Sequence, residues 1–275
     1  MSGRLYVVGT PIGNLGDISP RALEVLGSVD FIVAEDTRVT VKLLNHFDIK
    51  NELVSYYEHN KTEKGEYIIN RLLKGENAAI VSDAGMPAIS DPGEDLVRLA
   101  QKSGVAVESV PGPSAVVTAL AISGMNTKRF CFEGFLPTGK SERKEILEEL
   151  KTEGRTMVFY EAPHKLKATL KDFCSVFGKD RQIAVVKEIT KLHETVLKLS
   201  LGEAAEYYEE NQPKGEFVLI IAGREKTSLA TECSLEDALE IAKDLIKKGY
   251  SASAAAKEAA EATGRRKNEI YRSLI

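Results

Sequence analysis

The chain has 275 residues, with 37 Lys and Arg against 41 Asp and Glu, which gives a net charge of −4 at pH 7. Hydrophobic residues make up 43% and charged residues 28%, a composition that excludes disordered and fibrous proteins. This length suggests two domains, with room for a small appendage. A strongly basic, histone-like protein is also excluded, so any contact with nucleic acid must come from local basic patches.

The cysteine content and the first residues bear on the cellular compartment. Cys131, Cys174 and Cys233 are too scattered for a CxxC metal site and too few for a disulfide framework, which favours the cytosol. The opening MSGRLYVVGTPIGN lacks the long apolar run of a signal peptide. No window approaches the ~18 consecutive apolar residues of a membrane span. We therefore expect a cytoplasmic protein with no membrane partner and no metal.

Residues 1–124 alternate short runs of β-branched residues with amphipathic stretches. Ser19 and Pro20 suit the N-cap and first turn of the first helix. Strands are predicted at Leu5–Val8, Asp30–Glu35, Leu53–Tyr57, Ala78–Asp83 and Val105–Val110. This order predicts an α/β domain with a mainly parallel sheet and helices on both faces.

The pattern changes at Met125–Phe130, a predicted hinge. Residues 125–229 are expected to form a second, α+β domain with a mixed sheet and helices at Ser141–Leu150 and His164–Phe177. Its strands are predicted at Arg129–Phe135, Arg155–Glu161, Arg181–Ile189, Glu194–Ser200 and Gly215–Gly223. Residues 230–275 consist almost entirely of helix formers, broken at Gly249 and Gly264, which predicts a small domain of three short helices.

Three loops rich in small residues follow predicted strands: Gly9–Asn14 (GTPIGN), Ser82–Gly93 (SDAGMPAISDPG) and Pro111–Ala115 (PGPSA). Loops at the carboxyl ends of parallel strands face a common crevice in which ligands bind. Small residues allow the backbone to approach a ligand closely, while Ser82, Asp83 and Ser114 offer side-chain hydrogen bonds. Each loop alone is equally typical of a tight turn, but together they predict a site for a nucleoside-containing cofactor.

Polar side chains close the second and third predicted strands, in AEDTR (Ala34–Arg38) and YYEHN (Tyr56–Asn60). These motifs combine candidate bases with a cation and hydrogen-bonding groups at the rim of the expected crevice. For Asp36 and Thr37, helix capping is the alternative interpretation. YEAPHK (Tyr160–Lys165) and KEITKLHE (Lys187–Glu194) bring further polar groups to strand ends of the second domain.

Gly134–Ser141 reads GFLPTGKS and fits the phosphate-binding pattern G-x-x-x-x-G-K-[ST] between a predicted strand and a predicted helix. A P-loop nucleotide hydrolase or kinase is therefore an alternative function. Phe135 and Leu136 argue against it, since they are bulky where a phosphate cradle uses small residues. Two basic clusters are either solvated surfaces or phosphate contacts: Lys140, Arg143 and Lys144, and Arg265, Arg266, Lys267 and Arg272.

Taken together and in order, LYVVGTPIGNLGDISPRALEVL, AEDTR, SYYEHN, VSDAGMPAISDPG, VESVPGPSA, FEGFLP and FYEAPHKL resemble the tetrapyrrole methylase superfamily. They are most similar to its ribosomal RNA-modifying branch. VGTPIG at Val8–Gly13 replaces the V-G-x-G-P-G of tetrapyrrole-modifying relatives, and the helical tail also resembles the RNA branch. The resemblance implies a two-domain α/β fold, S-adenosylmethionine in the cleft between the domains, and a homodimer.

The implied reaction is methylation of the ribose 2′-hydroxyl of a cytidine in the decoding region of 16S rRNA, in the small ribosomal subunit. A tetrapyrrole precursor as substrate and a non-catalytic, RNA-binding assembly factor are the alternatives. The resemblance implies cofactor contacts from Ser82, Asp83, Ala84, Gly85, Ser114 and Ala115, with Pro11 and Tyr160 closing the pocket. Catalytic candidates are Glu35, Asp36, Arg38, His59 and Asn60, among which the base is left open between His59 and the two carboxylates. RNA contacts are expected from Arg38, Lys140, Arg143, Lys144, Arg265 and Arg266.

Overall fold

The computed structural model describes residues 2–224, 234–263 and 265–275. The chain divides into two compact units, Met1–Gly223 and Arg224–Ile275. Cys233, Gly264 and the predicted boundary at residues 229–230 lie outside the described residues. Within the described ranges, no helix is both long enough and apolar enough to cross a bilayer.

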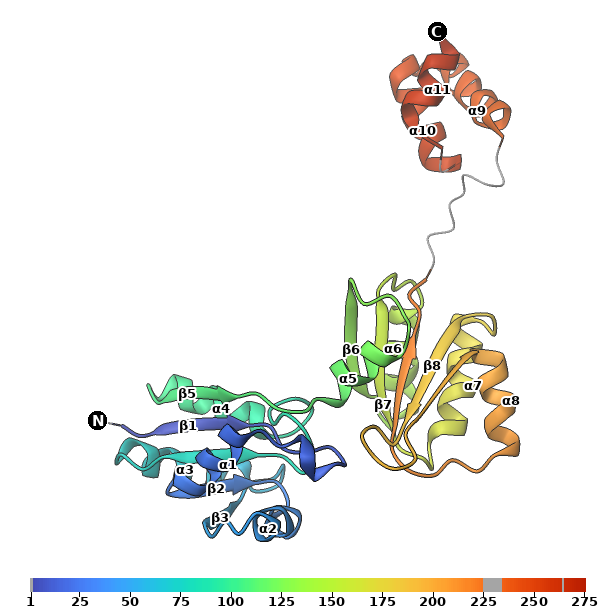
Figure 1. Cartoon of the computed structure of the whole chain (residues 1–275). Helices are drawn as coiled ribbons and strands as arrows, with labels where there is room; N and C mark the ends of the chain where they lie inside the picture. Colours follow the sequence, from blue (N-terminus) through green and yellow to red (C-terminus); the bar gives the residue numbers. More distant parts are fainter. Residues whose placement is uncertain (1, 225–233, 264) are drawn as a thin grey trace. The chain divides into compact units, whose positions relative to one another are not determined.

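The first unit begins with a five-stranded sheet in the order β3-β2-β4-β1-β5, in which all neighbours run parallel (Figure 1). Its strands are β1 (Arg4–Val8), β2 (Phe31–Ala34), β3 (Glu52–Ser55), β4 (Ala78–Val81) and β5 (Ala106–Val110). The central strands β2 and β4 are buried on both faces, as their unbroken apolar runs require. The predicted parallel α/β sheet is confirmed.

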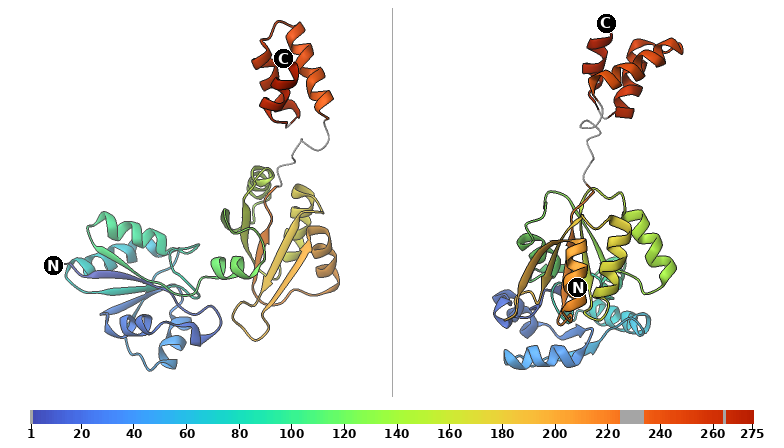
Figure 2. Two further views of the ribbon diagram at one scale, coloured as in Figure 1. Left: turned by 45° about the horizontal axis from the view of Figure 1, so that its top comes forward. Right: turned by 90° about the vertical axis from the view of Figure 1, so that its right-hand side faces the viewer.

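Helices cover both faces of this sheet (Figure 2). Helices α1 (Pro20–Ser28) and α2 (Thr37–His46) pack on one face, and α3 (Lys61–Leu73) and α4 (Gly93–Lys102) on the other. Successive side chains of a strand point to opposite faces, so Ile32 and Val33 belong to different cores. Ser19 caps α1 as predicted, since its hydroxyl accepts a hydrogen bond from the Ala22 amide at 3.1 Å.

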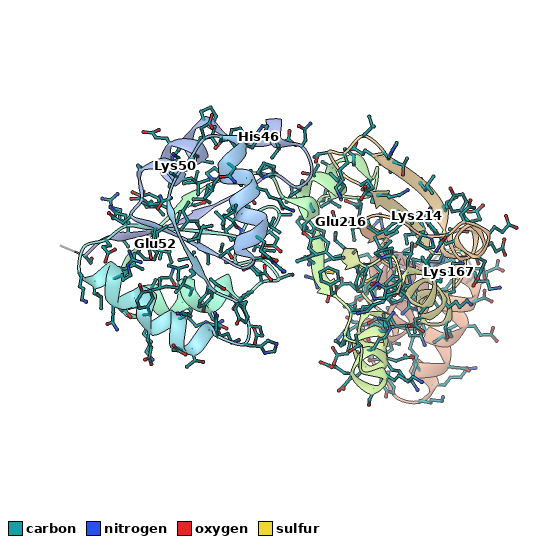
Figure 3. All side chains as sticks on the ribbon, turned by 90° about the horizontal axis from the view of Figure 1, so that it is seen from below. His46, Lys50, Glu52, Lys167, Lys214 and Glu216 are labelled. Carbon is teal, nitrogen blue, oxygen red and sulfur yellow. The ribbon has the colours of Figure 1, made fainter. Side chains whose placement is uncertain are left out.

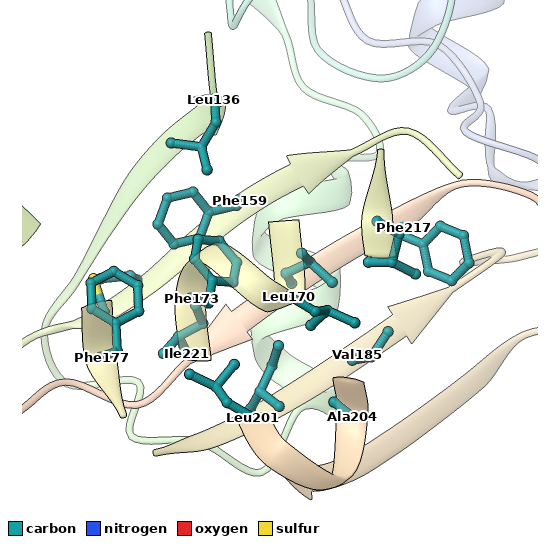
Figure 4. Close-up of a cluster of buried hydrophobic side chains, with 14 of the residues drawn as sticks. Leu136, Phe159, Leu170, Phe173, Phe177, Val185, Leu201, Ala204, Phe217 and Ile221 are labelled. Atoms are coloured by element: carbon teal, nitrogen blue, oxygen red, sulfur yellow. The ribbon is translucent and has the colours of Figure 1, made fainter. Parts of the chain in front are cut away.

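The second sheet is mixed, with the order β6-β7-β10-β8-β9. Only β6 and β7 are parallel, and the other pairs are antiparallel, which confirms the predicted mixed sheet. Its strands are β6 (Phe130–Phe135), β7 (Thr156–Glu161), β8 (Gln182–Lys187), β9 (Thr195–Ser200) and β10 (Phe217–Ile221). Helices α6 (Lys140–Leu150), α7 (Leu166–Phe177) and α8 (Leu201–Glu210) cover one face over a core that includes Phe159 and Phe173 (Figure 4).

Helix α5 (Ala115–Ile122) precedes the predicted boundary at residue 124 but packs on the second sheet. Val116, Ala119 and Leu120 join a core with residues of β7, β8 and β10 on the face opposite α6–α8. The chain therefore passes to the second sheet before α5, because one side of this helix completes the core of that sheet.

The second unit contains the three helices predicted for the tail: α9 (Leu235–Lys247), α10 (Ala252–Thr263) and α11 (Lys267–Leu274). Ser234 begins α9 with a capping box, in which its hydroxyl accepts from the Asp237 amide and the Asp237 carboxylate accepts from the Ser234 amide. Small side chains allow these helices to pack closely, since Ala238, Ala242, Ala255, Ala256 and Ala259 share the core with Ile270.

Two of the small-residue loops are held against each other. A Cβ added to Gly112, in PGPSA, would lie 2.8 Å from the carbonyl carbon and oxygen of Gly9, in GTPIGN. The glycines therefore serve the approach of two backbones at the ends of β1 and β5.

We predict that Gly112→Ala destabilises the protein by about 1–3 kcal/mol, because the added methyl meets rigid backbone. Gly27→Ala, in α1, is the matched control, since a Cβ there meets no atom within 4 Å. It should be neutral or stabilising by about 0.4–1 kcal/mol. Urea unfolding of both variants measures the difference, and equal stabilities would contradict the close contact of the two loops.

Candidate functional site

A pocket of about 490 Å³ lies between the two sheets of the first unit. From the first sheet it is lined by Ile12, Glu35, Ser82, Asp83, Ala84, Ile89, Ser90 and Asp91. From the second sheet and α5 it is lined by Ala115, Phe135, Tyr160, Glu161, Ala162, Pro163, Ile189, Glu216, Phe217 and Val218. Glu216, labelled in Figure 3, lies immediately before β10 on the side of the second sheet nearest the first.

The first-sheet wall comes from loops that follow β1, β2 and β4, three neighbouring strands. Backbone hydrogen bonds join two of these loops, from the Thr10 amide to the Gly85 carbonyl at 3.0 Å and from the Gly85 amide to the Thr10 carbonyl at 3.2 Å. The Asp36 amide donates to Oδ1 of Asp83 at 3.1 Å, and this bond joins the loop after β2 to the loop after β4. The crevice predicted at the carboxyl ends of the strands is therefore present.

A second pocket, of about 250 Å³, adjoins the first and shares Ser82 and Asp83 with it. Its other walls come from the loop after β1 and from α2: Thr10, Pro11, Gly13, Leu15, Val39, Thr40, Lys42 and Leu43. Ser82 and Asp83 thus form the partition between a larger and a smaller space.

The residues predicted to hold a cofactor are largely gathered at these pockets. Ser82, Asp83, Ala84, Ala115 and Tyr160 line the larger pocket, and Pro11 lines the smaller one. Neither Gly85 nor Ser114 is among the lining residues. Gly85 joins the loops that follow β1 and β4, and Ser114 is the N-cap of α5.

The five catalytic candidates are not brought together. Glu35 lines the larger pocket, whereas His59 and Asn60 line neither pocket. They follow β3, the edge strand of the sheet, and β2 separates that strand from β4. Asn60 holds a turn, because its Oδ1 accepts from the Tyr57 amide at 2.8 Å and its Nδ2 donates to the Ser55 carbonyl at 3.2 Å.

Asp36 and Arg38 pair with each other beside the pocket. Arg38 Nη2 lies 2.6 Å from Asp36 Oδ2, and the Arg38 amide donates to Asp36 Oδ1 at 2.8 Å. Asp36 is therefore the N-cap of α2, so the capping interpretation is confirmed. Hydrogen bonds from Arg38 lower the pKa of the Asp36 carboxyl to about 2.

Glu35 behaves in the opposite way. Burial raises the pKa of its carboxyl above the ordinary value, and the negative charges of Asp83, Asp91 and Asp36 raise it further. The pKa of Asp83 is also raised, mainly by burial. Among the three candidate bases of the sequence, Glu35 is the one that lines the larger pocket, and the pKa of its carboxyl is raised.

The larger pocket is acidic. Its described lining contains five carboxylates and no Lys, Arg or His: Glu35, Asp83, Asp91, Glu161 and Glu216. Lys191 pairs with Glu216 at 3.0 Å without lining the pocket itself. No group of three or more His, Cys, Asp or Glu suited to a metal ion occurs in the described part of the chain.

Arg143, predicted to contact RNA, connects two helices. Its Nε lies 2.7 Å from Asp172 Oδ2, and its Nη2 donates to the Thr169 hydroxyl at 2.8 Å. That hydroxyl donates to the buried carboxylate of Glu161, whose Oε1 accepts from the Ala162 amide at 2.8 Å. The α6–α7 contact thereby supports the wall of the larger pocket.

The other basic candidates are mostly exposed. Lys140, Lys144 and Arg266 lie at the surface, and Arg38 keeps its side chain in solvent although it pairs with Asp36. Arg265 forms an ion pair with Glu269 at 3.2 Å.

The lysine and serine that would bind phosphate in a P-loop line neither pocket. Lys140 and Ser141 are absent from both linings, and Leu136 is buried in the core of the second sheet. Phe135 is the residue of GFLPTGKS that reaches the larger pocket.

Comparison with known proteins identifies the family. A family model described as Tetrapyrrole (Corrin/Porphyrin) Methylases matches residues 4–205. The chain belongs to this family. A relative from Synechocystis sp., named ribosomal RNA small subunit methyltransferase I, is 45% identical over 272 residues, 98% of this chain and 96% of the relative. The resemblance seen in the sequence is confirmed.

Two further relatives of the same name differ in how much of this chain they match. The protein from Escherichia coli O157:H7 is 43% identical and covers 99% of this chain and 95% of its own. The protein from Thermotoga maritima is 47% identical over 223 residues, which are 81% of this chain but 100% of that protein. That relative carries the same name, although its whole chain is only about as long as the first unit here.

Solved structures show the same fold at low sequence identity. Uroporphyrin-III C-methyltransferase from Thermus thermophilus, complexed with S-adenosylhomocysteine, superposes with a TM-score of 0.57 at 18% identity and covers 80% of this chain and 97% of its own. A conserved hypothetical protein from Aeropyrum pernix K1 superposes with a TM-score of 0.64 at 17% identity and covers 100% and 96%.

Several lining residues of this tetrapyrrole methylase were not predicted. Ser90 and Asp91 lie in the motif SDAGMPAISDPG, and a strained backbone marks that loop, since Ala88 and Ser90 both have φ of 66°. Glu161 and Ile189 also lie in motifs noted from the sequence, at the ends of β7 and β8. Glu216 and Val218 carry no local sign, because only the pairing of β10 between β7 and β8 brings them to the pocket.

We predict that Arg143→Gln lowers the free energy of unfolding by about 1–3 kcal/mol, because charge-assisted hydrogen bonds in a poorly exposed place are lost. Lys144→Gln, the neighbouring exposed position, is the control and should unfold like the wild type. Chemical denaturation measures both. If Arg143→Gln kept its stability but bound RNA more weakly, Arg143 would be an RNA contact and not a structural residue.

Proposed function

We propose that the protein transfers the methyl group of S-adenosylmethionine to ribosomal RNA of the small subunit. The acceptor is the ribose 2′-hydroxyl of a cytidine in the decoding region of 16S rRNA. Relatives named for methylation of small-subunit ribosomal RNA, 45% and 43% identical over nearly the whole chain, support the substrate class. A ribosomal substrate implies action in the cytoplasm.

The observation that carries the proposal is the charge of the larger pocket. S-adenosylmethionine supplies a methyl group on a positively charged sulfur and also bears an ammonium group. Carboxylates in a partly desolvated pocket attract such a cation and repel a polyphosphate. Five carboxylates with no lining cation therefore support a sulfonium donor and give no support to ATP or to a P-loop reaction.

The pocket also has the right size and composition for this donor. Its volume of about 490 Å³ lies within the range of roughly 300–1,000 Å³ found for small-molecule sites. Ser82, Asp83 and Ala84 on one wall, and Ala115 and Tyr160 on the other, are the residues that we expect to hold it. Pro11, which we also expect near the donor, lines the adjoining smaller pocket, which shares Ser82 and Asp83 with the larger one.

Glu35 is the base that we propose for the acceptor hydroxyl. It lines the donor pocket, and its raised pKa makes it a stronger proton acceptor than an ordinary carboxylate. Asp36 is committed to Arg38 and to capping α2, and His59 lies at the edge of the sheet. Positioning of the hydroxyl for in-line attack supplies the rest of the rate enhancement.

RNA contacts are proposed for the exposed cations Lys140, Lys144, Arg38 and Arg266, through phosphate groups. Residues 1–125 contain 11 basic and 16 acidic residues, a net charge of −5. Binding therefore depends on local basic clusters, and affinity should fall steeply as salt rises.

The proposed function is tested with small ribosomal subunits from cells that lack the protein. Labelled S-adenosylmethionine should transfer its methyl group to one cytidine ribose, located by mass spectrometry of the RNA, and calorimetry should detect binding of the donor but not of ATP. Glu35→Gln should lose at least about 100-fold in rate, since general-base contributions are of that order, while donor affinity should fall much less, because four of the five lining carboxylates remain. ATP binding, or a change in absorbance with a porphyrin precursor, would contradict the proposal.

In the pH dependence of the methyl-transfer rate, the pH at which the rate falls on the acid side should depend on the charge of Asp91. Deprotonated Glu35 is required, so the rate falls as the pH drops through its raised pKa. Asp91→Asn removes one of the negative charges that raise this pKa, and the fall in rate should move to lower pH. The amide oxygen can still accept from the Ala88 and Gly93 amides, as Asp91 Oδ1 does at 3.0 and 2.8 Å. Glu24→Gln, on the exposed side of α1, is the control for net charge and should leave the pH of this fall unchanged.

We also propose that the protein is a homodimer that uses α5. All but one of the residues of this helix are apolar, yet Val117 and Ile122 are 59% and 40% exposed. A helix that is apolar on all sides is normally buried, and a second copy of the chain would cover its free side.

Val117→Glu should convert the dimer to a monomer, because the carboxylate would be desolvated in the interface. Light scattering coupled to size-exclusion chromatography measures the mass. Tyr207→Glu, another exposed apolar position on α8, is the control and should leave the mass unchanged. A monomeric wild type would refute the dimer, and the methyl-transfer proposal would be unaffected.

A further inference from the structure

The end of β6 turns an aromatic ring toward the larger pocket. The pairing of β6 with β7 shifts between Phe132 and Gly134. This β-bulge leaves Glu133 with no residue opposite it on β7. Gly134 has φ of 63°, in the left-handed region that favours glycine. Bulges of this kind change the face to which the following side chains point.

The effect of the bulge is visible in the residues on either side of it. Cys131 packs on the core under α6–α8, so strict alternation would point Phe135 toward that same core. Instead, Leu136 enters this core beside Phe159, as Figure 4 shows, and Phe135 lies on the opposite face. Phe135 is paired with Tyr160 across the strands, and their ring centroids are 5.4 Å apart.

Phe135 remains 57% exposed although it lines the pocket. The fold thus places a large apolar ring at the mouth of the pocket, beside an aromatic neighbour, without burying it. The deeper wall is formed by buried side chains, including Ile189, Phe217 and Val218. A donor of which most of the surface is enclosed belongs against that deeper wall, which leaves the face of Phe135 for a second planar group.

The surroundings of Phe135 indicate which planar group this is. Helix α6 begins five residues later, and its exposed Lys140 and Lys144 are suited to phosphate contacts. Aromatic rings next to exposed cations form the stacking platforms on which proteins bind single-stranded nucleic acid. A base that is stacked in a helix has both faces covered, so only an unstacked base can use such a platform.

We propose that Phe135 is the stacking platform for the base of the acceptor nucleotide, and that the protein takes this nucleotide unstacked from its neighbours. This inference rests on the proposed function and adds a recognition element to it. Phe135 positions the nucleotide and takes no part in the transfer of the methyl group or the proton.

The first experiment compares Phe135→Leu with Phe130→Leu. Phe130 is at the other end of β6, is 40% exposed and lines neither pocket, which makes it a matched control. Phe135→Leu should lower kcat/KM for small ribosomal subunits about tenfold or more, as expected for the loss of one base–aromatic stack. The Kd for S-adenosylmethionine should stay within about twofold, and Phe135→Tyr should restore activity.

The outcomes separate this inference from the proposed function. Absence of methyl transfer by the wild type would overturn the function itself. An active wild type with Phe135→Leu equal to Phe130→Leu would overturn the platform alone. A parallel loss of donor affinity in Phe135→Leu would also overturn it, because the ring would then be a wall for the donor.

A second measurement uses the absence of tryptophan from the chain. Phe135→Trp introduces a single fluorescent reporter, and Phe130→Trp is its control. A single-stranded RNA oligonucleotide that carries the target cytidine, with binding established by calorimetry, should quench Trp at position 135 and not at 130. Quenching by S-adenosylmethionine alone, or emission unchanged by bound RNA, would refute the stacking of the acceptor base.

Discussion

The site depends on the tie between the loops that follow β1, β2 and β4. Reciprocal backbone hydrogen bonds between Thr10 and Gly85 join the first and third of these loops, and the Asp36 amide on Asp83 joins the second. The contact of Gly9 with Gly112 extends the same edge to β5. Because these are mainly backbone contacts, the edge is held rigidly, and the side chains that it carries face one place. The pocket and its partition follow from that.

Charge is the second constraint. Burial raises the pKa values of Glu35 and Asp83, and the charges of nearby carboxylates, including Asp36 and Asp91, raise them further. A fold tolerates such a cluster where it serves a purpose. The cationic donor proposed for this pocket would lower the electrostatic cost when it binds, and its conversion to a product with a neutral sulfur would weaken the same attraction. With that donor, the arrangement would favour binding before the reaction and release after it.

The second sheet contributes support as well as a wall. Asp172, Arg143 and Thr169 form a chain of polar contacts from the surface of α6 and α7 to the buried carboxylate of Glu161. Glu161 in turn fixes the Ala162 amide in the pocket wall. Arg143, a member of the basic cluster, is thus part of the scaffold, and the neighbouring Lys140 and Lys144 are exposed.

Local patterns determined much of this protein in advance. Runs of β-branched residues bounded by turns located the strands of both sheets, and caps and helix formers located the start of α1, the helices α6 and α7 and the three tail helices, because these features depend on neighbours in the chain. The grouping of Ser82, Asp83 and Ala84 at a strand end likewise followed from the rule that such ends meet at one edge. Glu35 and Asp36 were equivalent in the sequence, and the ion pair with Arg38 separated them.

Only the tertiary structure decided the rest. The edge position of β3 removes His59 from the pocket, and strand order is set by the packing of helices on the sheet, which no local motif specifies. The packing of α5 on the second sheet depends on a core contributed by distant strands. The bulge in β6 reverses the direction of Phe135, and the insertion of β10 between β7 and β8 brings Glu216 to the pocket. These features arise from contacts between residues far apart in the chain, and their energies become defined only when both partners are in place.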